Sequence, residues 1–196
     1  MADLVIASGN PGKVREYRAL LAGLDVEELE TGVAEVGETY EANAALKAEA
    51  AGAATGLPAL GDDTGLEIEA LDGFPGLHSD RLAPTQAERE RLVFERLAVV
   101  PRPWRARFVC VIALAAPGAP TRFFRGERAG EVVEPRAPGG FGYDSVFLVP
   151  EAGLTFSEMG LEGKNRWSHR AAAVAALLQT WPAAGAVSPR RDPRQG

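Results

Sequence analysis

Two neighbouring carboxylates, Asp62 and Asp63, form the strongest candidate cation site in this 196-residue chain. They follow a short apolar run, and the Thr64 and Gly65 that come next predict a tight turn at the end of a strand. Adjacent carboxylates repel each other unless a cation neutralises them or they point to opposite sides. Mg²⁺ commonly takes one or two carboxylates together with substrate phosphates. The pair therefore favours magnesium-assisted phosphate chemistry, with a solvated acidic turn as the alternative.

A glycine-containing segment near the N-terminus, Ser-Gly-Asn-Pro-Gly-Lys at 8–13, is suited to binding an anion. Its small residues let backbone N–H groups approach an anion, and Lys13 adds a positive charge. The segment has the ingredients of a P-loop but not its spacing, because G-x-x-x-x-G-K-[ST] is absent and Val14 follows the lysine. The alternative is an ordinary turn between a strand and a helix, with an exposed lysine.

A second glycine-rich segment, Gly-Gly-Phe-Gly-Tyr-Asp at 139–144, places three glycines around an aromatic ring. Glycines allow a ligand to approach the backbone closely, and the Phe141 ring could stack on a nucleotide base. The alternative is a flexible hairpin in which Phe141 packs into the core. The residue types alone leave these two interpretations balanced.

Basic residues gather in the segment Lys-Asn-Arg-Trp-Ser-His-Arg at 164–170. Ser168 is a candidate N-cap of the last helix, which places His169 and Arg170 in its first turn. Cations at that position oppose the helix dipole, and a bound anion would reverse the penalty. We therefore expect these residues to face an anionic ligand, although a lone histidine is commonly structural.

The elements that must position these segments follow from the hydrophobic pattern. Residues 4–7 predict a buried strand, and an apolar stripe after Pro11 predicts a helix that leaves Glu16 on its outer side. Further strands are expected at 26–30, 66–71, 105–115, 121–133 and 145–149, and further helices at 39–54, 85–99 and 168–181. The chain is thus predicted to be an α/β protein with a mixed sheet, a single domain over 1–181 and a flexible C-terminal tail at 182–196.

Composition restricts the function classes. Hydrophobic residues make up 46% and charged residues 24% of a chain with net charge −6, which excludes a wholly disordered or fibrous protein. Because the tail carries +2, the rest carries −8, so neither nucleic acid nor a membrane is expected as a partner. The single cysteine, Cys110, lies in an apolar run and is predicted to be a core residue. A cytoplasmic location fits this cysteine usage.

Taken together and in this order, the segments resemble the inosine/xanthosine triphosphate pyrophosphatase family, the HAM1-like enzymes that act on non-standard purine nucleotides. The resemblance spans residues 4–178 and is specific as an ordered set, although each motif alone is weak. It is carried by SGNPGK (8–13), TYEANAALKA (39–48), GDDTGL (61–66), FPGLHSDR (74–81), RARF (105–108), GGFGYDSVF (139–147) and KNRWSHRAA (164–172).

The resemblance implies a mixed twisted sheet flanked by helices, with two lobes around a central substrate cleft, in a homodimer. It also implies Mg²⁺-dependent hydrolysis of ITP, dITP and XTP to the monophosphate and pyrophosphate. On that basis Asp63 is the catalytic residue, which binds metal and activates water. The substrate-binding residues implied are Ser8, Gly9, Asn10, Pro11, Gly12, Lys13, Thr64, Phe141, Gly142, Tyr143, Asp144, Lys164, His169 and Arg170.

The chain departs from the family pattern at two places. The family often has T-F-x-E-N-A where this chain has TYEANA at 39–44, so Ala42 occupies the usual glutamate position. Glu41 would face about 100° away on a helix. We expect Glu41 to replace it as second metal ligand after a local shift, the alternatives being an acid one turn earlier or the two aspartates with phosphate. The second departure is Asp80, which stands where a small residue is usual and adds a negative charge beside Arg81.

Three other functions remain as alternatives. A binding module could retain the pocket and have lost hydrolysis through Ala42, in which case it would bind nucleotide without turnover. A pyrophosphatase for modified pyrimidines or methylated bases is disfavoured by the order of the motifs. A nucleic-acid binder would have to rely on the three tail arginines against the −8 of the remaining chain.

Overall fold

Three long antiparallel strands form the centre of the fold: β3 (Ala59–Ile68), β5 (Trp104–Ala115) and β6 (Arg122–Val132). The computed structural model describes residues 2–181, and the predicted tail lies outside them. The remaining strands are β1 (Leu4–Ala7), β2 (Val26–Glu28), β4 (Pro75–Gly76), β7 (Phe147–Val149) and β8 (Leu154–Thr155). The helices are α1 (Pro11–Leu20), α2 (Tyr40–Thr55), α3 (Gln86–Leu97), α4 (Phe156–Trp167) and α5 (His169–Leu178), with a 3₁₀ turn at Glu69–Leu71.

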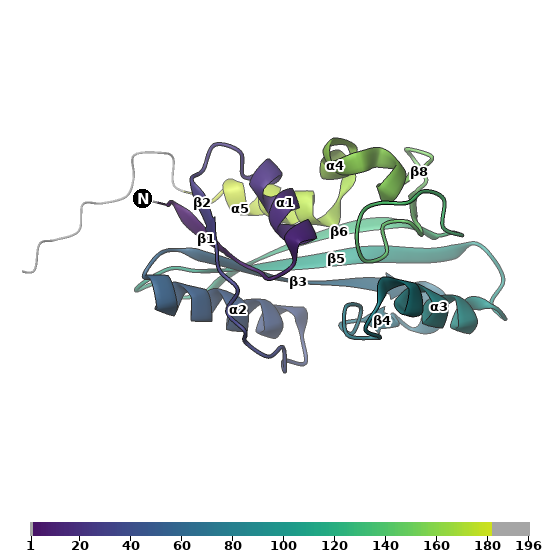
Figure 1. The fold of residues 1–196 in the computed structure, drawn as a ribbon, viewed down its shortest axis with the longest axis horizontal. Coiled ribbons are helices and arrows are strands. Elements are labelled where there is room, and N and C mark those ends of the chain that lie inside the picture. Colours follow the sequence, from purple (N-terminus) through teal and green to yellow (C-terminus); the bar gives the residue numbers. More distant parts are fainter. Residues whose placement is uncertain (1, 182–196) are drawn as a thin grey trace, which may run out of the picture.

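The eight strands form one mixed sheet in the order β2-β1-β3-β5-β6-β7-β8, with β4 on the edge of β3. β1 is parallel to β2 and β3, and the other neighbours are antiparallel. Helices α1, α4 and α5 lie on one side of the long strands and α2 on the other (Figure 1). This confirms the predicted α/β class with a mixed sheet.

Apolar residues fill both faces of the long strands. On one face Tyr17 of α1 and Leu177 of α5 pack with Ile112 and Cys110, which is fully buried as predicted. On the other face the small residues of α2, such as Ala44, pack on the odd-numbered residues of β5. Because alternate strand residues point to opposite faces, β3 and β5 are buried on both sides through most of their length.

Several predicted helix boundaries are confirmed by their capping contacts. The side chain of Thr39 accepts a hydrogen bond from the Ala42 N–H at 3.1 Å, and Gly56 ends α2 in the left-handed conformation. Thr85 begins α3 with a capping box, and Ser168 caps α5 as expected. These local signals fix where each helix begins.

Three predictions about local structure were wrong. Residues 62–65 do not form a turn but continue β3, because each pairs with a residue of β5 between Val109 and Ile112. The strand expected at 66–71 ends at Ile68 and is followed by the 3₁₀ turn. Glu16 is not on the outer side of α1, since it is only 2% exposed. In addition, the sequence analysis did not predict α4. The capping box between Thr155 and Glu158 is the sequence signal that marks the start of this helix.

Candidate active site

The adjacent carboxylates of β3 point to opposite faces of the sheet. Asp62 lies 3.1 Å from the Lys13 ammonium and 3.5 Å from the Arg170 guanidinium, and it accepts a hydrogen bond from the Thr64 hydroxyl at 2.9 Å. Burial alone would raise the pKa of Asp62, but Lys13 and Arg170 outweigh it and hold the pKa well below its ordinary range. Asp62 therefore stays ionised as the partner of these two cations.

Asp63 occupies a different environment, on the side of β3 that faces α2. One carboxylate oxygen accepts from the Asn43 amide at 2.9 Å and the other from the Thr64 backbone N–H at 2.9 Å. Burial raises the pKa of Asp63 and the nearby Glu35 charge adds to the rise, although Lys13, Asn43 and Lys47 act against it. A carboxylate with a raised pKa is a stronger base than an ordinary aspartate.

A buried cluster of charges joins α1, α4 and α5. The Lys164 ammonium lies 2.6 Å from Glu16 and 2.6 Å from Asp144, and Arg170 also pairs with Glu16. No side chain in the cluster is more than 4% exposed. Burial raises the pKa of Asp144, and Arg170 and Lys164 overcome the effect of burial to lower the pKa of Glu16. Each cation is thus held in place by carboxylates, so that the two positive charges of the cluster are balanced by Glu16 and Asp144.

The turn between β1 and α1 is organised by its own side chains. Asn10 caps α1 by accepting hydrogen bonds from the N–H groups of Gly12 and Lys13, at 2.9 and 3.2 Å. The Ser8 hydroxyl in turn accepts from the Asn10 N–H at 3.2 Å. Lys13 is buried beside Asp62 rather than exposed. The segment at 8–13 therefore brings a lysine, and not a free helix terminus, to the site.

A small pocket beside this turn joins the remaining predicted residues. It is lined by Lys13, Thr64, Ser79, Asp80, Phe108, Phe141, Gly142, Tyr143, Asp144, Lys164, His169 and Arg170, and has about 20 Å³ of free space. The Phe141 ring covers Gly12 so closely that an added Cβ there would come within 2.4 Å of it. The Lys164 ammonium lies 4.4 Å from the ring centroid. Phe141 thus forms the part of the pocket wall between Gly12 and Lys164.

His169 lies in this pocket with both ring nitrogens free of partners among residues 2–181. Its ring stacks on Phe108 at 4.5 Å between centroids and 11° between planes. Burial, and then the charges of Arg170 and Lys164, lower the pKa of His169 well below its ordinary value. The side chain is therefore a neutral imidazole with one donor and one acceptor available to a ligand.

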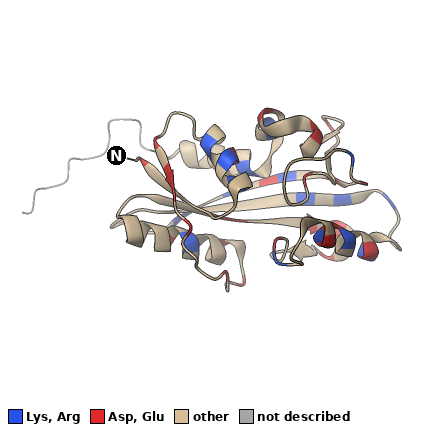
Figure 2. Cartoon of the chain, in the orientation of Figure 1, with Lys and Arg blue, Asp and Glu red and all other residues tan. Residues whose placement is uncertain are grey.

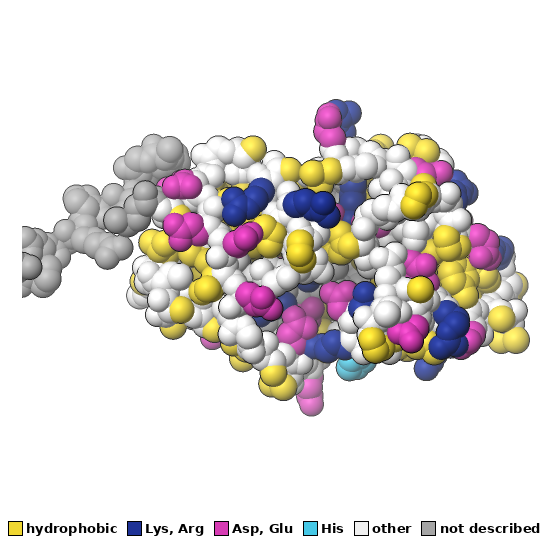
Figure 3. All heavy atoms as spheres, in the orientation of Figure 1, with side chains coloured by type: hydrophobic (Ala, Val, Ile, Leu, Met, Phe, Trp, Pro, Cys, Tyr) yellow, Lys and Arg dark blue, Asp and Glu magenta, His cyan; other side chains and the backbone are white. Residues whose placement is uncertain are grey.

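The sequence analysis did not identify Glu35 and Lys47, two residues whose charges act on Asp63. Glu35 pairs with Lys47 and lies 2.8 Å from the Arg81 guanidinium, which also donates to the Leu77 carbonyl at 2.9 Å. Glu35 precedes α2 in a segment without regular structure, so no periodic pattern marks it. On the face shown in Figure 3, acidic and basic side chains gather together near the middle of the molecule. Arg81 thus pairs with Glu35 rather than with Asp80.

Glu41, predicted to bind metal, lies on the first turn of α2 with its carboxylate 3.7 Å from Arg125 and its side chain 43% exposed. The contacts described for residues 2–181 do not link it to Asp63. Within that range no three His, Cys, Asp or Glu side chains converge on one point that could hold a metal ion. A metal here would depend on two carboxylates and on oxygens from a ligand.

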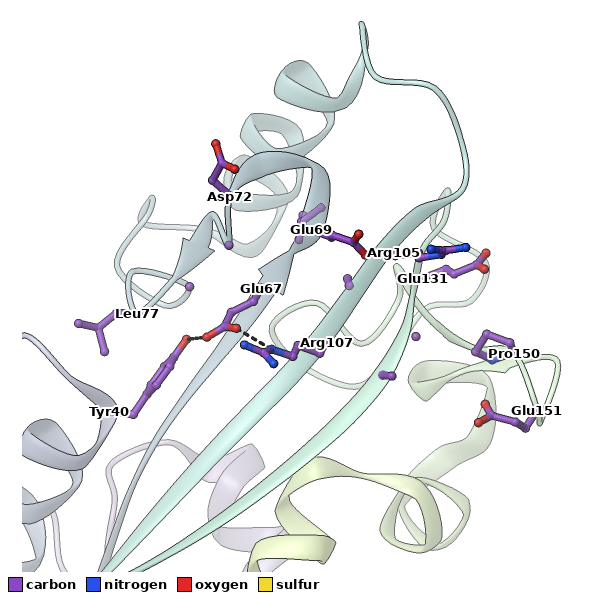
Figure 4. A pocket seen from close by; sticks show the side chains of 16 residues that line it. Tyr40, Glu67, Glu69, Asp72, Leu77, Arg105, Arg107, Glu131, Pro150 and Glu151 are labelled. Carbon is purple, nitrogen blue, oxygen red and sulfur yellow. Dashed lines mark hydrogen bonds and ion pairs between the residues drawn. The ribbon is translucent and has the colours of Figure 1, made fainter.

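A larger cavity, of about 1020 Å³, opens on the face of β3 and β5 that carries Glu67 and Arg107 (Figure 4). Glu67 accepts hydrogen bonds from the Tyr40 hydroxyl at 3.2 Å and from Arg107 at 2.7 Å. Its lining includes none of the predicted site residues, although it meets their surroundings at Tyr40 and Leu77. The chemistry therefore concentrates in the small pocket and around Asp63.

Comparison with known proteins identifies the family. The model of the Ham1 family matches residues 4–180. The chain belongs to the Ham1 family. The dITP/XTP pyrophosphatase of Symbiobacterium thermophilum is 48% identical over 190 residues, covering 92% of this chain and 95% of that protein. A dITP/XTP pyrophosphatase of Thermus thermophilus is 47% identical over 188 residues, covering 91% of each.

Solved structures of Ham1 proteins have the same fold. The Ham1 protein of Coxiella burnetii superposes with a TM-score of 0.79 at 38% identity, covering 91% of this chain and 98% of that one. The Staphylococcus aureus Ham1 protein superposes with a TM-score of 0.77 at 35% identity, covering 90% of this chain and 95% of that one. No helix within the described part of this Ham1 chain is long and apolar enough to cross a membrane.

Three buried basic residues of this Ham1 chain surround the small pocket. Lys13 lies on α1, whose blue segments stand beside the long strands in Figure 2. Lys164 and Arg170 approach from α4 and α5. Three helices that are distant in sequence thus bring three buried cations around one pocket, despite the negative net charge of the whole chain.

Proposed function

We propose that this Ham1 chain hydrolyses non-standard purine nucleoside triphosphates, ITP, dITP and XTP, to the monophosphate and pyrophosphate. The single observation that carries the proposal is the pocket in which the Phe141 ring and a neutral His169, without a hydrogen-bond partner in the described part of the chain, adjoin three buried cations. An aromatic ring and an imidazole suit a purine base, and the cations suit its phosphates. The dITP/XTP pyrophosphatases that share nearly half of its residues support the same conclusion.

The three cations act mainly by positioning the triphosphate. Lys13, Lys164 and Arg170 are already held by buried carboxylates, so they need little reorganisation when an anion arrives. Their charge stabilises the negative charge that develops as pyrophosphate leaves. The turn at 8–13, ordered by Ser8 and Asn10, presents Lys13 to the phosphates, and Thr64 contacts the substrate from β3.

Asp63 orients and deprotonates the attacking water. Its carboxylate is fixed by Asn43 and Thr64, and burial raises its pKa toward the range in which a base works best near neutral pH. Water attack at the α-phosphorus then requires little beyond alignment and charge stabilisation.

A divalent cation fits beside Asp63. The Glu35 charge acts on Asp63 and contributes to its raised pKa, so both carboxylates would attract a cation placed beside Asp63. Asp63 and Glu35 would hold it, with Glu41 as the alternative second ligand. Bound Mg²⁺ supplies Lewis-acid stabilisation of the phosphate and lowers the pKa of water.

Base selection rests on hydrogen bonds to the 6-oxo group. His169 and backbone groups of the Phe141 segment can present donors there. An adenine amino group would leave such donors unpaired in a buried pocket, which costs several orders of magnitude in kcat/KM. Tyr143 donates its hydroxyl to the Ser79 carbonyl at 3.1 Å, so it shapes the pocket from the other side.

The pocket must open to admit a base. Its free space of about 20 Å³ is far below the few hundred Å³ that ligand sites offer. Phe141 sits between glycines of positive φ, Gly140 at 71° and Gly142 at 63°, a backbone that few other residues adopt. We propose that this segment swings away and that the ring then stacks on the purine, between two lobes that form the substrate cleft.

We further propose that the enzyme is a cytoplasmic homodimer that pairs through the outer face of β6. On this face Phe123 is 47% exposed, and Arg125 lies between Glu127 at 2.7 Å and Glu41 at 3.7 Å. A face with both charges beside an exposed aromatic can complement itself about a two-fold axis. Light scattering on the protein and on Phe123→Asp tests this: an unchanged mass would contradict it.

A pyrophosphate-release assay tests the proposed activity. ITP, XTP, GTP and ATP are each supplied with Mg²⁺ and with a chelator. We expect rapid release from ITP and XTP only, and only with the metal. ITP binding without release from any nucleotide would favour a binding module instead.

A further inference from the structure

Asn43 connects Asp63 on β3 with the segment that carries Glu35. It lies in the first turn of α2 and is fully buried. Its amide nitrogen donates to a carboxylate oxygen of Asp63 at 2.9 Å, and its amide oxygen accepts from the Gly37 backbone N–H at 2.8 Å. One side chain thus contacts Asp63 on β3 and the segment that carries Glu35.

We propose that Asn43 is a positioning residue for the hydrolysis: it sets the orientation of the Asp63 carboxylate and its spacing from the Glu35 segment. The inference rests on the proposed function, because it assigns Asn43 a role in that reaction. Asn43 touches neither the nucleotide nor the water; it acts through Asp63.

The hydrogen bonds define the orientation of both side chains. A carboxylate oxygen can accept only from the nitrogen of the amide, and a backbone N–H can donate only to its oxygen, so the Asn43 amide has one consistent orientation. The other Asp63 oxygen is occupied by the Thr64 N–H at 2.9 Å. Both carboxylate oxygens of Asp63 are therefore held by hydrogen bonds. The lone pairs of these oxygens that remain free point in fixed directions.

The contact with Gly37 is close enough to exclude a side chain there. An added Cβ at Gly37 would lie 2.7 Å from the Ala42 Cβ and 2.8 Å from the Asn43 amide oxygen. Both atoms belong to the packed start of α2, so the segment would have to move away. Because Gly37 has no side chain, its backbone can pack directly against Asn43. This contact fixes the position of the segment that carries Glu35, two residues earlier.

The chain offers a matched set of variants. Asn43→Ala removes both hydrogen bonds, and Gly37→Ala brings a Cβ against Ala42 and the Asn43 amide oxygen, which displaces the Glu35 segment. Thr39→Ala is the control, because it removes the side-chain N-cap of the same helix without contact to Asp63. Thermal unfolding identifies any loss of stability common to the three.

Steady-state pyrophosphate release from ITP gives the first measurement. For Asn43→Ala we expect kcat to fall at least tenfold with KM for ITP within twofold, since the cations that bind the triphosphate are untouched. Gly37→Ala should show a smaller fall of the same kind, and the double variant should fall no further than Asn43→Ala alone. Loss of kcat in Thr39→Ala equal to that in Asn43→Ala, or a change confined to KM, would overturn the proposal.

Amide hydrogen exchange gives a measurement that needs no substrate. In Asn43→Ala, and not in Thr39→Ala, the Gly37 and Thr64 amides should exchange at least tenfold faster. Unchanged exchange at both amides would overturn the proposal even if ITP is hydrolysed. If the parent hydrolyses no nucleotide, faster exchange in Asn43→Ala would still show that Asn43 orders Asp63 and the Gly37 segment. That result would refute the proposed function rather than the structural role of Asn43.

Discussion

Asp62 and Asp63 are neighbours on β3 whose carboxylates serve opposite faces of the sheet. Asp62 faces Lys13 at 3.1 Å, and Asp63 faces Asn43 at 2.9 Å. The pleat of the strand separates the two charges, and each then meets a different partner. The sequence motif that looks like one acidic unit therefore divides into a carboxylate that holds cations and a carboxylate available for chemistry.

Asp63→Asn should abolish most activity and leave the fold intact. The amide keeps the size of the side chain but cannot deprotonate water, and general bases contribute about 10²- to 10⁴-fold. We expect kcat for ITP to fall at least a hundredfold with a melting temperature close to that of the parent. Hydrolysis within threefold of the parent would remove Asp63 from the mechanism.

Asp62→Asn should act on stability. Breaking a buried ion pair by removing one partner costs about 3–5 kcal/mol, because the other charge stays buried without compensation. Lys13 and Arg170 would both lose a partner, although Arg170 keeps Glu16. Urea unfolding at pH 7 measures the loss, and a change below about 0.5 kcal/mol, as for an ordinary surface substitution, would contradict it.

Acid should weaken the fold through Asp62 and Glu16. Both have a pKa below the ordinary value because buried cations outweigh the cost of burial. Such groups stabilise the fold above the unfolded pKa of about 4, and the stabilisation is lost as pH falls through the folded pKa. Asp63 and Asp144, with raised pKa values, act in the opposite direction.

Urea unfolding between pH 7 and pH 3 checks this dependence. We expect the free energy of unfolding of the parent to decline below about pH 5. The difference between the parent and Asp62→Asn should shrink over the same interval, because the unfolded chain takes up a proton on Asp62 there while the folded protein keeps this carboxylate ionised. A difference that stays constant with pH would show that Asp62 does not titrate in the way its cationic partners require.

Local sequence patterns predicted most of the helices and strands, but they did not predict which polar side chains are buried. The strand before residue 8, the helix between Thr39 and Gly56 and the long hairpin each carry a strong local signal: an apolar run, a cap or an alternation. Helix α4 carries a weak one, because Gly160, at φ 63°, interrupts its periodicity. Glu16 was misplaced since its burial comes from contacts with α4 and α5, which a helical pattern on α1 alone does not contain.

The candidate site shows the same limit. Residues with an unusual type in a recognisable motif, such as Lys13, Asp63 and His169, could be selected from the sequence. Glu35 could not, because its partners Lys47 and Arg81 lie 12 and 46 positions away and nothing local marks the pairing. Ion pairs between residues distant in sequence form only in the folded chain, so no periodic pattern in the sequence indicates them.

Glu35→Gln and Glu41→Gln should separate the two candidate metal ligands. Glu35 influences Asp63 directly, whereas Glu41 pairs with Arg125 on the exposed face. We expect Glu35→Gln to lower kcat at least tenfold and to raise the Mg²⁺ concentration needed for half-maximal rate. Glu41→Gln should stay within twofold of the parent on both measures. The reverse order would assign the metal to Glu41 instead.

Phe141→Ala should weaken nucleotide binding even though it enlarges the pocket. The ring occupies space that a purine needs, so its removal takes away an obstacle. However, stacking on an aromatic ring is worth about 1–3 kcal/mol per base, and the ring is the flat surface on which the purine would stack. We therefore expect Kd for ITP to rise by about tenfold. Phe94→Ala, an equal truncation whose ring lies 6.0 Å from Trp104, is the control. Tighter binding by Phe141→Ala would show that the ring only blocks the pocket, and that the base is held by His169 and its neighbours alone.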